Sequence, residues 1–199
     1  MERCDTCGRE LSSGATISVT GRGTYCSSCY NEWLAKESGV RFDNTDLDPV
    51  TLRDAAGVSH TFRIHSRFAL GAGHVMEAIE EETDGYGYQF KVMGPEESDA
   101  MTLFSELYAR MRSGLARQYV RPAQFGPQLV HGHELEGRIE LDPESDDPVV
   151  VVDGRPLSWA ATGHLLRTYE GWTIRIEMTD PHNLAPGNGE PQGSKDDAH

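Results

Sequence analysis

Hydrophobic and polar residues alternate in several short segments of this chain. The segment VTLRDAAGVSHTFRIHSRF alternates on both sides of Ala55-Ala56-Gly57, which predicts two strands joined by a turn. YQFKVMG (88–94) and VVVV (149–152) also predict strands. HVMEAIEEE (74–82) fits either a short helix or a strand. Alternation with a period of two therefore dominates the pattern, and we expect mostly antiparallel strands.

One long segment has a helical repeat instead. In GPEESDAMTLFSELYARMRSGLARQYV (94–120), Pro95 and three acidic residues come early and arginines come late, as the helix dipole favours. Pro122 would end this helix. We expect it to be amphipathic and to pack on a sheet through one apolar stripe. That stripe comprises Met101, Phe104, Leu107, Tyr108, Met111 and Leu115.

The C-terminal third of the chain predicts further strands and a second helix. LVHGHELEGRIELD (129–142) predicts one long strand, bent at Gly132 or Gly137. After the strand 149–152 and a turn at Asp153-Gly154, we expect a helix capped by Ser158 and ended by Gly171, then a strand at 172–178.

All four cysteines lie in the first thirty residues, spaced Cys4-x2-Cys7-x18-Cys26-x2-Cys29. Two residues between thiolates allow a tight turn to direct both sulfurs at one ion, and four thiolates suit tetrahedral Zn²⁺. Between the pairs, ATISVTGRGTYC predicts a hairpin. After them, SSCYNEWLAKESG predicts a helix, capped by Ser27 or Ser28 and ended by Gly39.

This order of knuckle, hairpin and helix resembles a treble-clef zinc finger of the LIM or GATA type, over residues 1–39. The resemblance implies that Cys4, Cys7, Cys26 and Cys29 hold one zinc ion per chain. Because four cysteines leave no position for water, the zinc would be structural. LIM-type fingers mostly bind proteins. GATA-type fingers bind DNA through basic flanks, whereas the flank here, RFDNTDLDP, is acidic.

Two other readings of the cysteines stay open. Disulfides would suit an oxidising compartment, and an iron site of the rubredoxin type uses the same paired motif. The N-terminal sequence MERCDTCG lacks the apolar stretch of a signal peptide, and no segment approaches eighteen apolar residues. We therefore expect a cytoplasmic protein without a membrane span, whose thiols stay reduced.

The net charge of −14 lies entirely outside the cysteine-rich segment. Residues 1–41 carry five basic and five acidic side chains, and residues 42–199 carry 13 basic and 27 acidic ones. Such an excess disfavours binding to a phosphate backbone. It favours a basic protein partner. We expect an α+β protein with a finger at 1–39, a linker at 40–49, an α+β domain at 50–180 and a disordered tail at 181–199.

The α+β domain contains no Walker loop, no G-x-S-x-G and no H-E-x-x-H. Its candidates for chemistry are few, and each has a plain structural alternative. Two candidates involve histidine: a second metal site at His131 and His133 with His65 or His74, and a pair of His74 and Glu77 on one helical face. Two segments are acidic: residues 80–82, which we expect to be a solvated helix end, and a loop that either binds Ca²⁺ or is a solvated turn, with Asp142, Glu144, Asp146 and Asp147. The last candidate is an aromatic cluster, in the core or at an interface, of Trp159, Tyr169 and Trp172.

The segment LSWAATGHLLRTYEGWTIRIEM (157–178) is similar to the C-terminal module of uncharacterised prokaryotic proteins that also begin with a Cys4 finger. That resemblance implies no activity. Three functions remain: an adaptor or regulatory protein that binds other proteins, a nucleic-acid-binding regulator using Arg3, Arg9, Arg22 and Arg41, and an enzyme with a site near His65, His131, His133 and Glu134. We favour the first, and the oligomeric state stays undetermined.

Overall fold

The computed structural model describes residues 2–11, 16–39, 47–69, 73–81, 83, 86–124, 126–130, 133–142 and 145–179. Most of the expected linker, the expected tail and the residues His131, Gly132 and Glu144 lie outside these ranges. The described chain is α+β, as predicted, and each of its strand pairs is antiparallel.

The N-terminal segment forms two hairpins and a helix. Strands β1 (Glu2–Arg3) and β2 (Glu10–Leu11) pair with each other, as do β3 (Ile17–Val19) and β4 (Gly23–Tyr25). Helix α1 (Ser27–Ser38) follows and ends at Gly39, which has φ 70°. The hairpin and the helix are confirmed. The cap is not a serine, because the Cys26 side chain accepts the backbone hydrogen bond of Cys29 at the start of α1.

The central sheet is a four-strand meander in the order β5-β6-β7-β8. The segment 74–82, which fitted a helix or a strand, is mostly strand β7. One face of each strand carries apolar residues, as the alternation predicted: in β6 these include Phe62, Ile64 and Phe68. The bounds are β5 (Val50–Arg53), β6 (Ser59–Ala69), β7 (Gly73–Glu80) and β8 (Gln89–Gly94).

Helix α2 (Ala100–Leu115) covers the apolar face of this sheet. Asp99 caps it by accepting a hydrogen bond from the Thr102 backbone, so Pro95, Glu96 and Glu97 lie before the helix rather than in its first turn. The predicted stripe was wrong in part: Met101 is 53% exposed and Leu103 is buried. The buried residues follow a four-residue repeat, Leu103, Leu107, Met111 and Leu115, against Phe62, Ile64, Met76, Ala78 and Val92.

The C-terminal part has its own three-stranded sheet, in the order β11-β12-β13. The single long strand expected at 129–142 was wrong: its two ends belong to different sheets. Strand β13 was not predicted, whereas Ser158 does cap a helix. The bounds are β9 (Val120–Arg121) and β10 (Gln128–Leu129), which pair with each other, then β11 (Arg138–Leu141), β12 (Pro148–Val152), β13 (Arg155–Ser158), α3 (Trp159–Leu166) and a 3₁₀ turn (Arg167–Tyr169).

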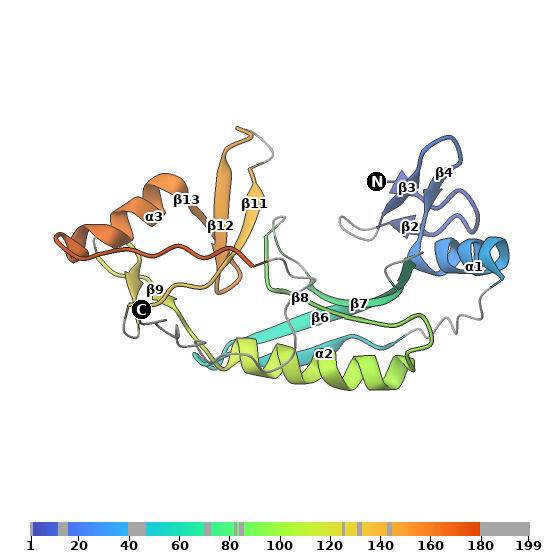
Figure 1. Ribbon diagram of the computed structural model, residues 1–199, viewed down its shortest axis with the longest axis horizontal. Helices are drawn as coiled ribbons and strands as arrows, with labels where there is room; N and C mark the ends of the chain where they lie inside the picture. The colour runs from blue at the N-terminus through green and yellow to red at the C-terminus, as the bar shows by residue number, and fades with distance from the viewer. Residues whose placement is uncertain are drawn as a thin grey trace, which may run out of the picture.

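The finger and the C-terminal sheet lie on the side of the central sheet away from α2 (Figure 1). Asp153, at the turn between β12 and β13, accepts hydrogen bonds from the backbone N–H groups of Tyr119 and Val120, at 2.9 and 2.8 Å. Arg138 donates to the backbone carbonyl of Gly87 at 3.2 Å. These contacts attach the C-terminal sheet to the chain that leaves α2 and to the segment before β8.

The finger contacts the central sheet through α1, which packs against β6. Strand β5 pairs with β6 only as far as Phe62. Further along β6, the Asn31 side chain takes the place of a neighbouring strand. Its Nδ2 donates to the Ser66 carbonyl at 2.8 Å, and its Oδ1 accepts from the Phe68 N–H at 3.0 Å. Asn31 is 0% exposed, so this two-point contact joins finger and sheet away from water.

We predict that Asn31→Ala destabilises the contact between finger and sheet by about 2–4 kcal/mol, because it leaves a buried carbonyl and a buried N–H without a partner. The free energy of opening at the Phe68 amide, measured by hydrogen exchange, reports this loss directly. Glu32→Ala is the matched control, since Glu32 is the next residue of α1 and is exposed. Equal protection of Phe68 in both variants would contradict the prediction.

Candidate metal centre

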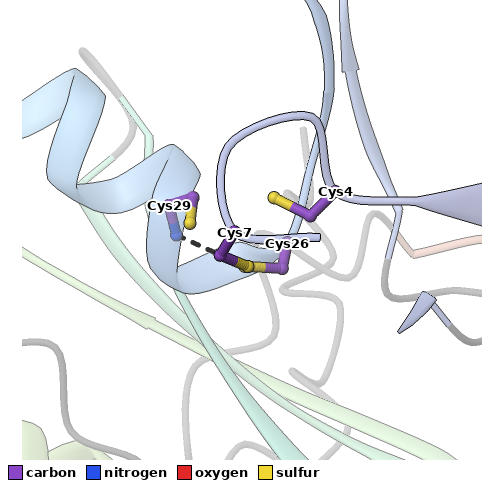
Figure 2. A group of neighbouring side chains, drawn as sticks. All are labelled: Cys4, Cys7, Cys26 and Cys29. Atoms are coloured by element: carbon purple, nitrogen blue, oxygen red, sulfur yellow. Dashed lines mark hydrogen bonds between the residues drawn. The ribbon is translucent and has the colours of Figure 1, made fainter. Parts of the chain in front are cut away.

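Four cysteine sulfurs converge at the junction of the first knuckle and α1. Cys4 and Cys7 lie in the loop after β1, Cys26 caps α1, and Cys29 lies in its first turn (Figure 2). All four sulfurs lie within 4.8 Å of one another. The Sγ atoms of Cys7 and Cys26 are 3.8 Å apart. The four cysteines are therefore positioned to bind one metal ion.

The sulfur spacing fits a tetrahedral ion. With metal–sulfur bonds of about 2.3 Å, the edges of a tetrahedron of thiolates are about 3.8 Å long, which matches the distance between Cys7 and Cys26. A disulfide requires about 2.05 Å between sulfurs. All four cysteines are free thiols in this structure, so the geometry favours a shared ion over disulfides.

The backbone forms the knuckle that brings Cys4 and Cys7 together. The Gly8 N–H donates to the Cys4 carbonyl, and the Cys4 N–H donates to the Arg9 carbonyl, both at 2.9 Å. Gly8 has φ 70°, a conformation that a residue with a Cβ adopts only at a cost. The glycine directly after the second cysteine therefore closes the turn.

Asp5 attaches this knuckle to the second hairpin. Its N–H donates to the Thr24 carbonyl at 2.8 Å, and its carboxylate accepts from the Thr24 N–H at 2.7 Å. Gly23 lies directly beside the carboxylate: a Cβ built at Gly23 would lie 2.3 Å from Asp5 Oδ2. Because Thr24 precedes Cys26 by two residues, the contact places the first cysteine pair next to the second.

The four thiols do not ionise equally. Burial opposes ionisation of Cys4, but nearby backbone N–H groups, those of Cys26 and Cys7 first, lower its pKa to about 6. Burial raises the pKa of Cys26 and of Cys29; the other three sulfurs add to the rise at Cys29, whereas at Cys26 the contact with Cys29 opposes it. One thiolate is thus favoured at neutral pH. Further thiolates in the same small space require a cation to offset their repulsion.

The cysteines also make up most of the interior of the finger. Its buried cluster consists of Cys4, Leu11 and Cys26, with Cys29 packed against it. A segment of about forty residues with so few buried apolar side chains needs a metal or a covalent link for stability. With four thiolates around it, an ion has no position for a water or substrate, and its role would be structural.

Among the residues that the structure describes, the other proposed metal ligands do not come together. Within the described ranges, the cysteines are the only group of three or more metal-ligating side chains in close reach. His131 lies outside those ranges, and His133 contacts the rings of Tyr169 and Trp172. The buried His74 ring bonds the Ser66 hydroxyl at 2.7 Å. The expected His74–Glu77 pair was wrong, because residues three apart on a strand face opposite sides.

The acidic candidates have structural partners. Glu80 contacts His60, and Glu81 pairs with Arg63, so the expected solvated helix end at 80–82 was wrong for these two. In the candidate Ca²⁺ loop, for which a solvated acidic turn was the alternative, the Asp142 carboxylate accepts from the Ser145 N–H at 3.2 Å, and the Asp142 N–H donates to the Asp147 carbonyl at 2.9 Å. These bonds join the two ends of the segment between β11 and β12.

Sequence reasoning missed a polar cluster around His60. Its Nδ1 lies 2.5 Å from Glu80, and its Nε2 lies 3.2 Å from Asp54. Glu80 also accepts from the Tyr88 N–H at 2.8 Å. Burial opposes ionisation of Asp54, but the Val58 N–H and His60 lower its pKa. Because the two carboxylates approach opposite ring nitrogens, the cluster links a turn to β7 and leaves neither nitrogen free.

The aromatic cluster lies on the surface instead of in a core. Trp159 is 61% exposed and Trp172 is 60% exposed. Trp172 lies 4.4 Å from the His133 ring and 5.6 Å from the Tyr169 ring, measured between centroids. Of the two readings, core and interface, the structure contradicts the core for both tryptophans. Separately, none of the described helices is long and apolar enough to cross a bilayer.

Three family models match successive parts of the chain, and each is described as a domain of unknown function. Residues 3–41 are similar to DUF7685, residues 43–116 to DUF7686 and residues 119–183 to DUF7713. None of the three covers half of the chain. No curated protein and no solved structure matches the chain.

We predict that Gly23→Ala weakens metal retention much more than Gly21→Ala does. Both glycines have positive φ, at 123° and 76°, so both variants carry a backbone cost. Only at Gly23 would the new Cβ displace Asp5, because Gly21 has open space around it. Competition with a chelator should show at least a tenfold faster loss of metal from Gly23→Ala, corresponding to about 1.4 kcal/mol in the barrier. Equal rates would contradict a positioning role for Asp5.

Proposed function

We propose that this chain is a zinc-stabilised interaction protein, in which a treble-clef finger carries one structural zinc and the C-terminal part binds another protein. The observation that carries the proposal is the combination of a closed cysteine site with a C-terminal part that exposes its large apolar side chains. The finger provides no open coordination position, so its metal would stabilise the fold and leave recognition to the surface.

The choice of zinc rests on ligand chemistry. Four thiolates in a tetrahedron suit Zn²⁺ or iron. Zinc has no redox chemistry, and its structural sites are closed Cys4 sites of this kind. The order of knuckle, β3–β4 hairpin and α1 supports the treble-clef type.

The C-terminal part exposes an unusual amount of apolar surface. Among the described residues, ten large apolar side chains are exposed, and eight of them lie between Ile139 and Met178. The buried apolar residues of this part are few: Val149, Val151, Val152 and Leu165. Such a concentration of exposed apolar side chains in one part of the chain supports a binding surface there. The eight exposed residues are Ile139, Leu141, Trp159, Leu166, Trp172, Ile174, Ile176 and Met178.

The alternative functions have less support. Of the arginines considered for nucleic acid, Arg22 lies over the Trp33 ring at 4.9 Å and Arg3 pairs with Glu10 at 3.1 Å. The enzyme reading required His65 and His133 in one site, but His65 lies on the central sheet and His133 lies beside the C-terminal aromatic residues. With a net charge of −14, the proposed partner would be a basic protein.

The zinc proposal predicts one zinc per chain in the protein purified from its own host. Cys26→Ser should reduce this ratio to near zero, because it removes one thiolate ligand, while the serine hydroxyl can still cap α1. Ser18→Ala, at an exposed position of β3, should keep the metal. Elemental analysis with native mass spectrometry measures both variants. Iron in the wild-type protein, or two disulfides without metal, would contradict the zinc assignment.

The interaction proposal predicts that Ile139→Thr with Leu141→Thr lowers recovery of the bound protein at least tenfold. These two side chains lie on the same face of β11 and are exposed, so threonine removes apolar contact area and keeps β propensity. Val58→Thr, an exposed position in the turn between β5 and β6, is the matched control. Quantitative cross-linking in the host measures recovery. Equal recovery from both variants would contradict binding through β11.

A further inference from the structure

Residues 170–179 leave the 3₁₀ turn as an extended segment, and every one of them is exposed (Figure 1). The segment contains an alternating pattern of four apolar residues, Trp172, Ile174, Ile176 and Met178, which are 60%, 60%, 64% and 76% exposed. The sequence predicted a strand here, but the structure forms none. The side-chain pattern is thus that of a strand with one apolar face, although none of the described strands pairs with it.

The backbone of this segment is also unpaired. Beyond the bond from the Trp172 N–H to the Tyr169 carbonyl, no backbone hydrogen bond joins residues 172–179 to another described residue. An extended chain with a row of free N–H and C=O groups is a template for pairing with another strand. The start of the segment is held by ring contacts of Trp172 with His133 and Tyr169, which lowers the ordering cost of pairing.

We propose that residues 173–179 pair in antiparallel register with the same residues of a second copy of this chain, around a two-fold axis at Ile176. The inference deepens the proposed function and rests on it, because it identifies one protein that the exposed C-terminal surface binds. The interface is isologous, as is usual in homodimers.

The charges on the polar face select this register. Centring the pair on Ile176 places Arg175 of each copy opposite Glu177 of the other. A pair centred on Arg175 would place the two Arg175 side chains opposite each other. A pair centred on Glu177 would do the same with the two Glu177 side chains, and like charges directly opposite each other are destabilising. A shift that pairs neighbouring residues would put polar side chains on the apolar face. In the single chain, Arg175 and Glu177 already lie on the same side, 3.4 Å apart.

The apolar face fits the same arrangement. Ile176 would lie opposite Ile176 of the second copy, and Ile174 opposite Met178, while Thr173 and Thr179 would pair on the polar face. β-Branched cross-strand pairs of this kind stabilise antiparallel ribbons. A lone two-stranded ribbon is only marginally stable, but here each strand is continuous with the folded C-terminal part. Pairing would therefore bring Ile174, Ile176 and Met178 of both copies together on one face of the ribbon, where cross-strand neighbours shield part of each side chain.

Charge exchange tests the proposal on the full chain. Light scattering after size exclusion should give the wild-type protein twice the 22.0 kDa of one chain. Arg175→Glu and Glu177→Arg each place like charges opposite each other at two symmetric positions, and each should raise the dimer dissociation constant at least tenfold. Glu106→Arg, on the exposed surface of α2, is the matched control and should stay dimeric.

Two rescue experiments identify the partner as a second copy. The double variant Arg175→Glu with Glu177→Arg should dimerise again, because the two charges have exchanged places and each again lies opposite a charge of the other sign. A mixture of the two single variants should form a heterodimer, because one chain then presents two glutamates and the other two arginines. Neither rescue is expected if the segment binds a different protein or folds back on its own chain.

The outcomes separate this inference from the proposed function. A wild-type monomer, or charge variants that all stay dimeric, overturns the self-pairing. So does loss of the dimer without rescue. In each of these cases the test at Ile139 and Leu141 can still succeed, because those residues lie on β11. Conversely, if the dimer is rescued, the self-pairing is supported even when the β11 variant recovers as much bound protein as its control.

Discussion

The convergence of four cysteine sulfurs is the constraint from which the arrangement of the N-terminal half follows. Cys26 is a member of the cluster and also the cap of α1, so the cluster fixes where the helix begins. The start of the helix fixes where Asn31 lies, and Asn31 contacts the β6 backbone at Ser66 and Phe68. Thiolates so close together repel one another unless they share a cation. This electrostatic requirement therefore affects the position of α1 and, through Asn31, its contact with the central sheet.

This chain of contacts implies that the finger and the sheet are coupled in stability. The sheet has its own interior beneath α2, formed by residues such as Phe62, Met76 and Leu107, so we expect it to fold without a metal. The finger has little interior besides its cysteines. Loss of the metal should therefore release α1 first and expose the part of β6 that Asn31 covers. The remaining sheet would keep its packing against α2.

The sequence was sufficient for the local features and insufficient for those that depend on distant partners. The cysteine spacing, the hairpin after Ile17 and the strands around Ala55–Gly57 follow from short patterns, because turns and alternation are local properties. The stripe of α2 was predicted correctly at Leu107, Met111 and Leu115 but included Met101 in place of Leu103, since both are apolar and only the placement of the sheet decides which is buried. The split of 129–142 and the roles of Asn31 and His60 could not be predicted, because each depends on residues far away in sequence.

The segment 172–178 differs from these cases, because its alternation predicted a strand that the structure does not form, and no described strand pairs with it. Alternation specifies that one face of a strand is to be covered, but it does not specify by which molecule. In the central sheet, the alternating residues of β6 are covered by α2 of the same chain. Beyond Tyr169, no described element covers Ile174 or Ile176. A polar face on which Arg175 and Glu177 are complementary about Ile176 favours a second copy as that molecule, since self-pairing would place each of these charges opposite the other.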